Sequence, residues 1–396
     1  MQASDCLLNS KLFPLTSDVR YVSSYTYPTT YVQRSLTPVQ GYVEGTSTFS
    51  AVTLSSSLTG RQNKFWGGVL APNGHIYFVP QAGSIGDFVP STGAFSLIDI
   101  TSVIVLPYSG GVLAPNGLIY FVPHNADNIG VFNPFTRVFA VVDISLVIAH
   151  DSKYVGGVLA PNGHIYFVPY NADSIGDFNP TTGAFSVISI SVSLCATPLC
   201  GYKYEGGVLA PDGHIYFVPH NANCIGDFDP ATGIFTVIDI SSFIAHGAKY
   251  VGGVLAPNGL IYFVPTNADN IGVFNPSTRV FSTIDISSVI VHDEKYAGGV
   301  LAPNGHIYFV PYNADNIGVF NPSTGAFSGI DISSVIATGN KYIGGVLGLN
   351  GRIYLVPSNA NSIGQIHLGN QEPAYKVSGG VPVTWGALLS PYVNKL

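Results

Sequence analysis

The chain has 396 residues, of which 46% are hydrophobic and only 9% are charged, and its formal net charge at pH 7 is −7. The acidic balance and the lack of a basic run argue against nucleic-acid binding, because neutralising phosphates requires clustered lysine and arginine side chains. No apolar stretch approaches the roughly 20 residues needed to span a bilayer, so we expect no membrane insertion.

One phrase recurs along the chain, Gly-Gly-Val-Leu-Ala-Pro-Asn-Gly followed by a variable residue and Ile-Tyr-Phe-Val-Pro. Each copy is followed by further short runs rich in Val, Ile and Phe, separated by Asn-Pro and Thr-Gly pairs that are typical of turns. Four antiparallel strands in a repeat of about 46 residues predict a propeller blade. The expected fold class is therefore all-β, a β-propeller with seven clear four-stranded repeats. Their first glycines are Gly67, Gly110, Gly156, Gly206, Gly252, Gly298 and Gly344.

Two segments carry a resemblance to a known repeat. Residues 210–216 read Ala-Pro-Asp-Gly-His-Ile-Tyr, and residues 228–233 read Phe-Asp-Pro-Ala-Thr-Gly. They resemble the YVTN-type propeller repeat, and the resemblance covers about residues 64–369. It implies that Gly-Gly-Val-Leu-Ala forms the innermost strand of each blade. It implies little about function, because propellers host hydrolases, lyases, redox enzymes and scaffolds.

The two ends of the chain leave two arrangements open. Residues 48–55 match the outer-strand pattern, so the amino terminus is expected to supply a strand where the ring closes. Residues 385–391 echo residues 66–72, including the only two tryptophans in the chain. Either the ring has seven blades with two appendages, or residues 20–27, 30–35, 48–55 and 385–391 form an eighth, composite blade. The paired tryptophans slightly favour the composite blade. We divide the chain into an N-terminal segment 1–45, repeats 46–369 and a closing segment 370–396.

Comparison of the seven repeats with one another reveals a linked pair of positions. The residue after Asn/Asp-Gly is His in four repeats, and in three of these the residue after Ile-Gly is Asp. Since these positions fall opposite each other across a hairpin, we interpret them as structural cross-strand pairs rather than as catalytic dyads. The pairs are His75–Asp87, His164–Asp177 and His214–Asp227.

A second recurrent feature is a Lys-aromatic pair before six of the seven inner strands, on the same face as the loops that hold an Asp. A ring of Lys, Tyr, Asn and Asp around the channel mouth is a candidate site for a sugar or an acidic ligand. The alternative is that each Lys pairs with an Asp of its own or a neighbouring blade, at roughly 0–1 kcal/mol per pair. The candidate binding residues are Lys153, Tyr154, Tyr170, Asp173, Lys249, Tyr250, Asp269, Lys295, Tyr296, Tyr312 and Asp315.

No segment supplies a nucleophile with its base, a carboxylate pair or a set of metal ligands. The inner strands are expected to contribute Gly, Val, Leu and Ala to the axis, so we predict no catalytic residues, no metal, no cofactor and no enzyme activity. Four cysteines are too few for a disulfide framework, and whether Cys195 and Cys200 bond to each other is left open.

The function expected from these features is a rigid, non-enzymatic scaffold or binding protein. Repeats of this type are similar to those in aquatic microbial, algal and viral (phage) proteins. With the absence of a recognisable secretory signal, this resemblance implies a virion component, such as a tail-associated, fibre or capsid-decorating protein at the particle surface, or else a cytoplasmic protein. Its partners would be other proteins of an assembly, a host-surface glycan or protein, or further copies of itself. The alternatives are a lectin-like propeller and a lactonase-like or lyase-like propeller enzyme.

Overall fold

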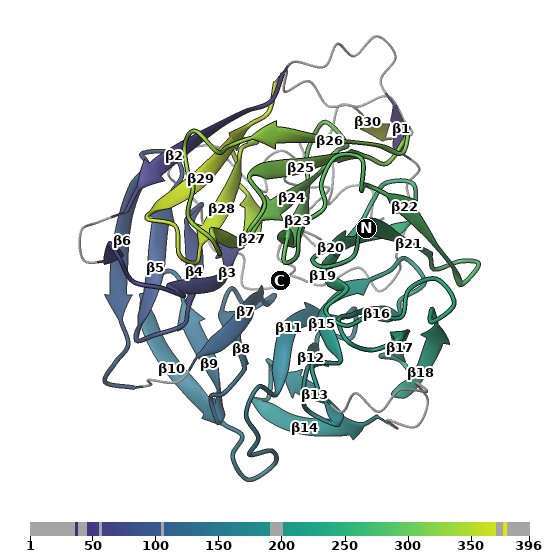
Figure 1. Ribbon diagram of the computed structural model, residues 1–396. Helices are drawn as coiled ribbons and strands as arrows, with labels where there is room; N and C mark the ends of the chain where they lie inside the picture. The colour runs from purple at the N-terminus through teal and green to yellow at the C-terminus, as the bar shows by residue number, and fades with distance from the viewer. Residues whose placement is uncertain are drawn as a thin grey trace.

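The computed structural model describes residues 36–38, 46–54, 58–103, 107–190, 201–369 and 375–377. The described residues contain seven four-stranded antiparallel sheets and no α-helix. The sheets are arranged around a common axis with their innermost strands at the centre (Figure 1). The protein is therefore a seven-bladed β-propeller, as the repeats predict.

Six blades are formed by consecutive strands, which run from the axis outwards. The first three blades contain β3 (Phe65–Leu70), β4 (Ile76–Pro80), β5 (Ser84–Val89) and β6 (Ala94–Asp99); β7 (Tyr108–Leu113), β8 (Ile119–Pro123), β9 (Asn128–Asn133) and β10 (Val138–Asp143); and β11 (Tyr154–Leu159), β12 (Ile165–Pro169), β13 (Ser174–Asn179) and β14 (Ala184–Ser189). The next three contain β15 (Tyr204–Leu209), β16 (Ile215–Pro219), β17 (Cys224–Asp229) and β18 (Ile234–Asp239); β19 (Tyr250–Leu255), β20 (Ile261–Pro265), β21 (Asn270–Asn275) and β22 (Val280–Asp285); and β23 (Tyr296–Leu301), β24 (Ile307–Pro311), β25 (Asn316–Asn321) and β26 (Ala326–Asp331).

The seventh blade closes the ring by joining the two ends of the chain. It contains β27 (Tyr342–Leu347), β28 (Ile353–Pro357), β29 (Ser362–His367) and, as its outer strand, β2 (Thr48–Thr53). Phe49 lies opposite Ile366 across this seam. The sequence-based prediction of an amino-terminal closing strand is thereby confirmed.

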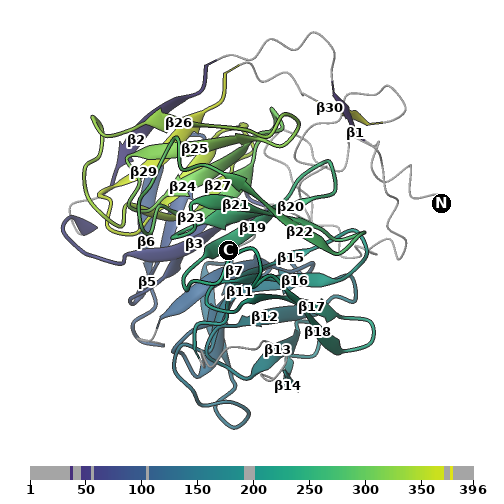
Figure 2. The same ribbon diagram turned by 45° about the vertical axis from the view of Figure 1, so that its right-hand side comes forward.

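The slight preference for an eighth, composite blade is wrong. The strand expected to belong to it, β2, completes the seventh blade instead. The seventh blade also packs directly against the first, because Phe65 and Ile76 share a buried cluster with Val346 and Val356. Residues 20–27, 30–35 and 385–391, the other expected parts of that blade, lie outside the described residues. A separate two-stranded sheet pairs β1 (Leu36–Pro38) with β30 (Tyr375–Val377), away from the ring (Figure 2).

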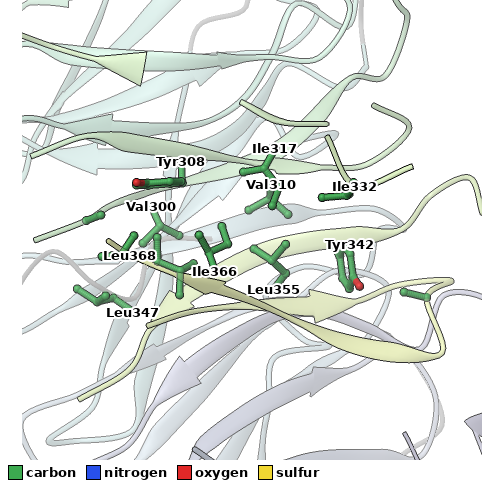
Figure 3. Close-up of a cluster of buried hydrophobic side chains, with 13 residues drawn as sticks. Val300, Tyr308, Val310, Ile317, Ile332, Tyr342, Leu347, Leu355, Ile366 and Leu368 are labelled. Carbon is green, nitrogen blue, oxygen red and sulfur yellow. The ribbon is translucent and has the colours of Figure 1, made fainter. Parts of the chain in front are cut away.

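The hydrophobic core lies between neighbouring blades. Figure 3 shows one such cluster, in which Val300, Tyr308 and Val310 of the sixth blade meet Leu347 and Leu355 of the seventh. The second strand is buried over its whole length in every blade. It reads Ile-Tyr-Phe-Val-Pro in the first six blades and Ile-Tyr-Leu-Val-Pro in the seventh. Outer strands alternate between exposed and half-buried residues, as edge strands that face water on one side do. Each blade therefore depends on its neighbours for burial of its strands.

The second glycine of each repeat makes this close packing possible. A Cβ on Gly111 would lie only 2.8 Å from Cγ2 of Val69 in the preceding blade. Real side-chain carbons do not approach so closely, so only glycine lets the inner strand lie flat against its neighbour. The glycine before it has a different role, because Gly110 adopts φ +89° at a bulge in the inner strand.

Candidate functional site

The inner strand of every blade begins at the same face of the ring, which we call the mouth face. Each inner strand carries a β-bulge just after its first residue, as in β15, where the register shifts between Tyr204 and Gly207. Bulges redirect side chains and are enriched beside functional sites. In each repeat the residue in this bulge differs from blade to blade, whereas its neighbours hardly change. The bulge residues are Trp66, Ser109, Val155, Glu205, Val251, Ala297 and Ile343.

A second variable position lies on the same face, directly after the second strand of each blade. Its side chain reaches toward the next blade: Gln81 Nε2 donates to the carbonyl of Tyr108 at 3.0 Å, and Nδ1 of His124 lies 3.2 Å from the carbonyl of Tyr154. The residues at this position are Gln81, His124, Tyr170, His220, Thr266, Tyr312 and Ser358. The mouth face thus carries two positions that vary between the repeats.

Six of these and adjacent residues form one contact network, which we call the mouth cluster: Trp66, His124, Tyr170, Tyr202, Glu205 and His220. The ring centroids of Trp66 and His124 are 5.1 Å apart, those of His124 and Tyr170 are 6.0 Å apart, and those of Tyr170 and His220 are 5.8 Å apart. Tyr202, which is 47% exposed, lies against Tyr170 with a centroid distance of 4.7 Å. The network therefore crosses the first four blades.

Glu205 is the acidic member of the mouth cluster. It is only 5% exposed, and its Oε2 lies 3.6 Å from Nε2 of His220. Burial raises the pKa of Glu205 to about 8 and lowers the pKa of His220 to about 4. At pH 7 both groups are therefore predominantly neutral, so the short distance between them does not represent a full ion pair.

The electrostatic influence of Glu205 reaches two tyrosines on different blades. Burial is the main cause of the raised pKa of Tyr170, and the charge of Glu205 adds to it. Burial also raises the pKa of Tyr312 to about 12, with smaller contributions from Glu294 and then Glu205. Glu205, on the fourth blade, thus acts on side chains from the third and the sixth blade.

Three polar groups of the cluster lack hydrogen bonds within the described part of the chain. Nε1 of Trp66 and Nδ1 of His220 are buried without a partner, and the carboxyl group of Glu205 has only the 3.6 Å contact with Nε2 of His220. Leaving a buried polar group unpaired costs on the order of 1–3 kcal/mol. Such groups are therefore rare outside functional sites and call for an explanation.

The expectation that the inner strands present only Gly, Val, Leu and Ala to the axis is wrong at the bulge position. Trp66, Ser109 and Glu205 break the pattern there. The sequence contained a signal for this position, because the residue after each Lys-aromatic pair varies between the repeats, whereas the residues before and after it hardly change. It was missed because the position was taken as part of a uniform inner strand.

The candidate binding residues predicted from the Lys-aromatic pairs fall into three structural groups. Lys153, Lys249 and Lys295, and the tyrosines that follow them, Tyr154, Tyr250 and Tyr296, have no exposed surface. Asp173, Asp269 and Asp315 are 71%, 50% and 70% exposed. Tyr170 and Tyr312 are half-buried on the mouth face. A ligand can reach the aspartates and these two tyrosines, and the binding role remains a prediction.

The buried lysines join neighbouring blades. Nζ of Lys295 donates to the carbonyls of His292 at 2.5 Å and Asn267 at 3.3 Å, and it lies 3.1 Å from Oδ1 of Asp269. The equivalent ion pairs are Lys153–Asp127, Lys203–Asp173 and Lys341–Asp315. These contacts correspond to the alternative in which each Lys pairs with an Asp. Because the ammonium group is buried and also bonded to carbonyls, the figure for surface pairs does not describe them.

The His–Asp pairs lie at the opposite face of the ring. Nδ1 of the histidine is 2.7 Å from Oδ1 of the aspartate in His75–Asp87 and 2.6 Å in both His164–Asp177 and His214–Asp227. The partners are not directly opposite each other, because Asp177 pairs with Tyr166 in the strand register and His164 reaches it diagonally. These contacts fit a structural role within the blade.

The remaining sequence predictions concern metal ligands, membrane spans and cysteines. Among them no group of three or more His, Cys, Asp or Glu side chains could hold a metal ion, and no helix is long and apolar enough to cross a membrane. Cys224 is disulfide-bonded and 1% exposed. Cys6, Cys195 and Cys200 lie outside the described residues, so a bond between Cys195 and Cys200 is left open.

Comparison with known proteins identifies the fold. No protein-family model matches the chain, and no curated protein is significantly similar in sequence. Among solved structures, a streptogramin B lyase matches with a TM-score of 0.66 and 19% identity, over 82% of this chain and 98% of that chain. Virginiamycin B lyase from Staphylococcus aureus matches with a TM-score of 0.67 and 17% identity, over 82% of this chain and 100% of the other. The extracellular domain of a protein described as a hybrid two-component system from B. thetaiotaomicron matches with a TM-score of 0.63 and 13% identity, over 85% and 44%.

At these identities the likeness establishes the fold alone. The matched structures include enzymes and an extracellular domain, so the same architecture serves different functions. The resemblance to the YVTN-type repeat and to viral proteins stays a prediction.

Proposed function

We propose that this chain is a non-enzymatic binding protein, in which a rigid seven-bladed ring presents one asymmetric docking site on its mouth face. The carrying observation is that aromatic and titratable side chains from four different blades meet at this face in one network that no other set of blades repeats among the described residues, whereas the strands beneath them repeat almost unchanged. A scaffold needs the repeated part, and a single specific site needs the part that breaks the repeat. The half-buried Tyr170 and the exposed Tyr202 supply the aromatic surface that is enriched at interfaces.

The experiment that tests this proposal compares the two faces of the ring. A partner is first recovered by cross-linking in purified particles or at the host surface, and its affinity for the purified chain is measured. Tyr170→Ala and Tyr312→Ala on the mouth face are expected to weaken binding at least tenfold. Phe135→Ala is the matched control, because Phe135 is 53% exposed and lies beside Gly117 at the opposite face. Equal loss in all three variants would contradict docking at the mouth face.

As the biological setting of this docking function we propose a virion surface component, such as a tail-associated, fibre or capsid-decorating protein. Support comes from the resemblance of the repeats to those in viral and aquatic microbial proteins. Stoichiometric presence of the chain in purified particles is the expected result. Its absence from them would remove this setting but leave the docking site untouched.

A lectin-like function is the second candidate, favoured by the neighbouring rings of Tyr170 and Tyr202 beside a carboxyl group. Binding on a glycan array that is lost in Tyr170→Ala and Tyr312→Ala would support it, and an inactive array would reject it.

An enzyme is the third candidate, favoured by the lyases among the similar folds and by the Glu205–His220 contact. It predicts turnover of a streptogramin that Glu205→Gln abolishes, whereas unchanged substrate after prolonged incubation would reject that reaction.

A further inference from the structure

We propose that the mouth cluster binds an organic ammonium ion, with Glu205 as its counter-charge and the rings of Tyr170 and Tyr202 as its apolar and π-electron surface. This inference rests on the proposed function, because it names the chemical class that the docking site recognises. The same residues also argue against a metal ion and an anion as the ligand.

The first argument is that Glu205 lacks a cation. The two nearest lysines along the chain are engaged elsewhere: Nζ of Lys203 lies 2.9 Å from Oδ1 of Asp173, and Nζ of Lys249 donates to the carbonyl of His246 at 2.6 Å and to Oδ1 of Asn223 at 3.1 Å. His220 is the remaining neighbour, and it is neutral at pH 7. A buried carboxyl group with no cation of its own is an unusual choice at a position where other blades carry Val, Ala or Ile.

The second argument concerns the surroundings of the carboxyl group. Rings contact one another from Trp66 through His124 and Tyr170 to His220, and Tyr202 extends this surface outwards. A cation over the face of Trp or Tyr is attracted by the electrons of the ring, and clusters of aromatic rings are a recurrent means of recognising quaternary ammonium groups. The unpaired Nε1 of Trp66 offers a hydrogen bond to an acceptor elsewhere on the ligand.

The third argument excludes other ligand classes. A divalent metal ion needs several oxygen or nitrogen ligands, and no such group exists among the described residues. An anion would be repelled by Glu205 once it ionises, and Asp173 and Glu294 add negative charge to the same face.

Binding of a cation is therefore coupled to release of a proton. At pH 7 about one-tenth of the free protein has Glu205 ionised, because the pKa of this group is about 8. The ammonium ion binds the ionised form, so one carboxyl proton passes to the buffer. Apparent affinity then follows the ionised fraction and rises about 50-fold from pH 6 to pH 8. The other titratable groups that face the cluster are His124, His220, Tyr170, Tyr202 and Tyr312, together with Glu294, Asp173 and the paired lysines. Burial lowers the pKa of His124 and of His220 and raises the pKa of Tyr170 and of Tyr312, so these shifts move their titration away from the range between pH 6 and pH 8.

Calorimetry with the full chain and choline as the probe tests the inference. Choline is a quaternary ammonium ion that does not titrate, and 3,3-dimethylbutan-1-ol is its neutral isostere. We expect choline to bind with an affinity that rises with pH, the alcohol to bind at least tenfold more weakly, and close to one proton to be released at pH 7 in buffers of different ionisation enthalpy.

Two glutamate variants locate the site. Glu205→Gln keeps the shape of the side chain and is expected to abolish both choline binding and its pH dependence. Glu294→Gln is the matched control, since Glu294 is an exposed acid on the same face, and it should change the affinity less than threefold. Should Glu205→Gln not fold, the pH series and the neutral isostere on the unchanged chain still decide the question.

The inference is overturned if the alcohol binds as well as choline, if affinity does not change with pH, if Glu205→Gln binds normally, or if neither probe binds. Preferential binding of a neutral sugar at the same residues also overturns it. None of these results affects the docking proposal, which is tested by the partner and by Tyr312→Ala and Phe135→Ala. Loss of partner docking with choline binding intact would instead reject the proposed function alone.

Discussion

Glu205 is the residue whose environment departs furthest from the repeat. The equivalent position holds Val155, Val251 and Ala297 in other blades, all of them buried, so the fold itself favours a small apolar side chain there. Placing a carboxyl group in this environment costs stability whenever the group must ionise. Because structure alone does not require an acid at this position, its presence points to recognition.

Glu205→Gln is predicted to stabilise the protein relative to the unchanged chain as the pH rises. The pKa of Glu205 rises from 4.5 in the unfolded chain to about 8 in the folded one. Below pH 4.5 both states hold the proton and the two proteins should differ little. Between pH 4.5 and 8 the unfolded state alone is ionised, so the unchanged chain loses about 1.4 kcal/mol per pH unit. Urea unfolding at pH 5, 6, 7 and 8 measures the difference, and a constant difference would contradict the raised pKa.

Lys249 differs from Lys153, Lys203, Lys295 and Lys341 because the preceding blade offers it Asn223 where those four meet an aspartate. Burial lowers the pKa of Lys249 to about 8. Asn223→Asp is predicted to supply the missing charge, to raise this pKa and to stabilise the protein by about 0.5–1 kcal/mol at pH 7, because the new carboxylate is itself partly exposed. Thermal unfolding measures the gain, and Asn125→Asp is the control, since Lys153 in that blade already pairs with Asp127.

At the scale of strands and turns, some neighbouring blades share an ionic contact that others lack, at the face opposite the mouth. Asp87 and Asp227 are each 2% exposed and accept both from a histidine of their own blade and from an arginine of the next, Arg137 or Arg279, at 2.5 Å. These arginines adopt φ +60° and +58° in turns where other blades have glycine. The ion pair accounts for a non-glycine residue in this strained conformation.

Asp227→Asn is predicted to destabilise the protein by about 1–3 kcal/mol, because it leaves Arg279 without its buried partner. Asp177→Asn is the matched control, since Asp177 contacts His164 and has no arginine partner within the described part of the chain; its loss should be below about 1 kcal/mol. Denaturant unfolding measures both. Equal stability losses in the two variants would show that the arginine contributes nothing.

The same substitution should change the titration of His214. Burial lowers the pKa of His214, but the hydrogen bond and the charge of Asp227 outweigh this effect, so the net pKa is raised. NMR titration should therefore find a lower pKa of His214 in Asp227→Asn.

The sequence predicted strands and turns well and the functional face poorly. The glycine, Asn-Gly and Ile-Tyr-Phe-Val-Pro patterns determine local conformation directly, so the blade and the closing strand at residues 48–55 followed from them. The number of blades depended on which sheet that strand joins. The sequence similarity around Trp385 gave no information about which strands pair. The mouth cluster combines Trp66, Tyr170 and Glu205 from three blades, and only the ring brings such distant positions together.

The ring is one cooperative body because every blade buries its strands against the next. The seam is the place where this continuity depends on a single strand from the other end of the chain. Phe49 of β2 packs near Tyr342, with ring centroids 6.4 Å apart, and Leu54 and Val52 contribute to the cluster between the seventh and first blades. Loss of β2 would uncover this cluster and leave the backbone of β29 unpaired.

Two truncations test closure at the scale of the whole molecule. Removal of residues 1–54 takes away β2 and is predicted to lower the midpoint of thermal unfolding by at least about 10 °C or to prevent folding, since it exposes a core edge in a structure whose blades depend on their neighbours for burial. Removal of residues 1–45 leaves β2 in place and should shift the midpoint by only a few degrees, if residue 46 begins the propeller as the sequence predicts. Differential scanning calorimetry on both proteins compares them directly. Because the ring transmits the loss of one strand to both neighbouring blades, the longer truncation should broaden the transition as well as lower it; equal behaviour of the two proteins would mean that the amino-terminal strand does not hold the ring closed.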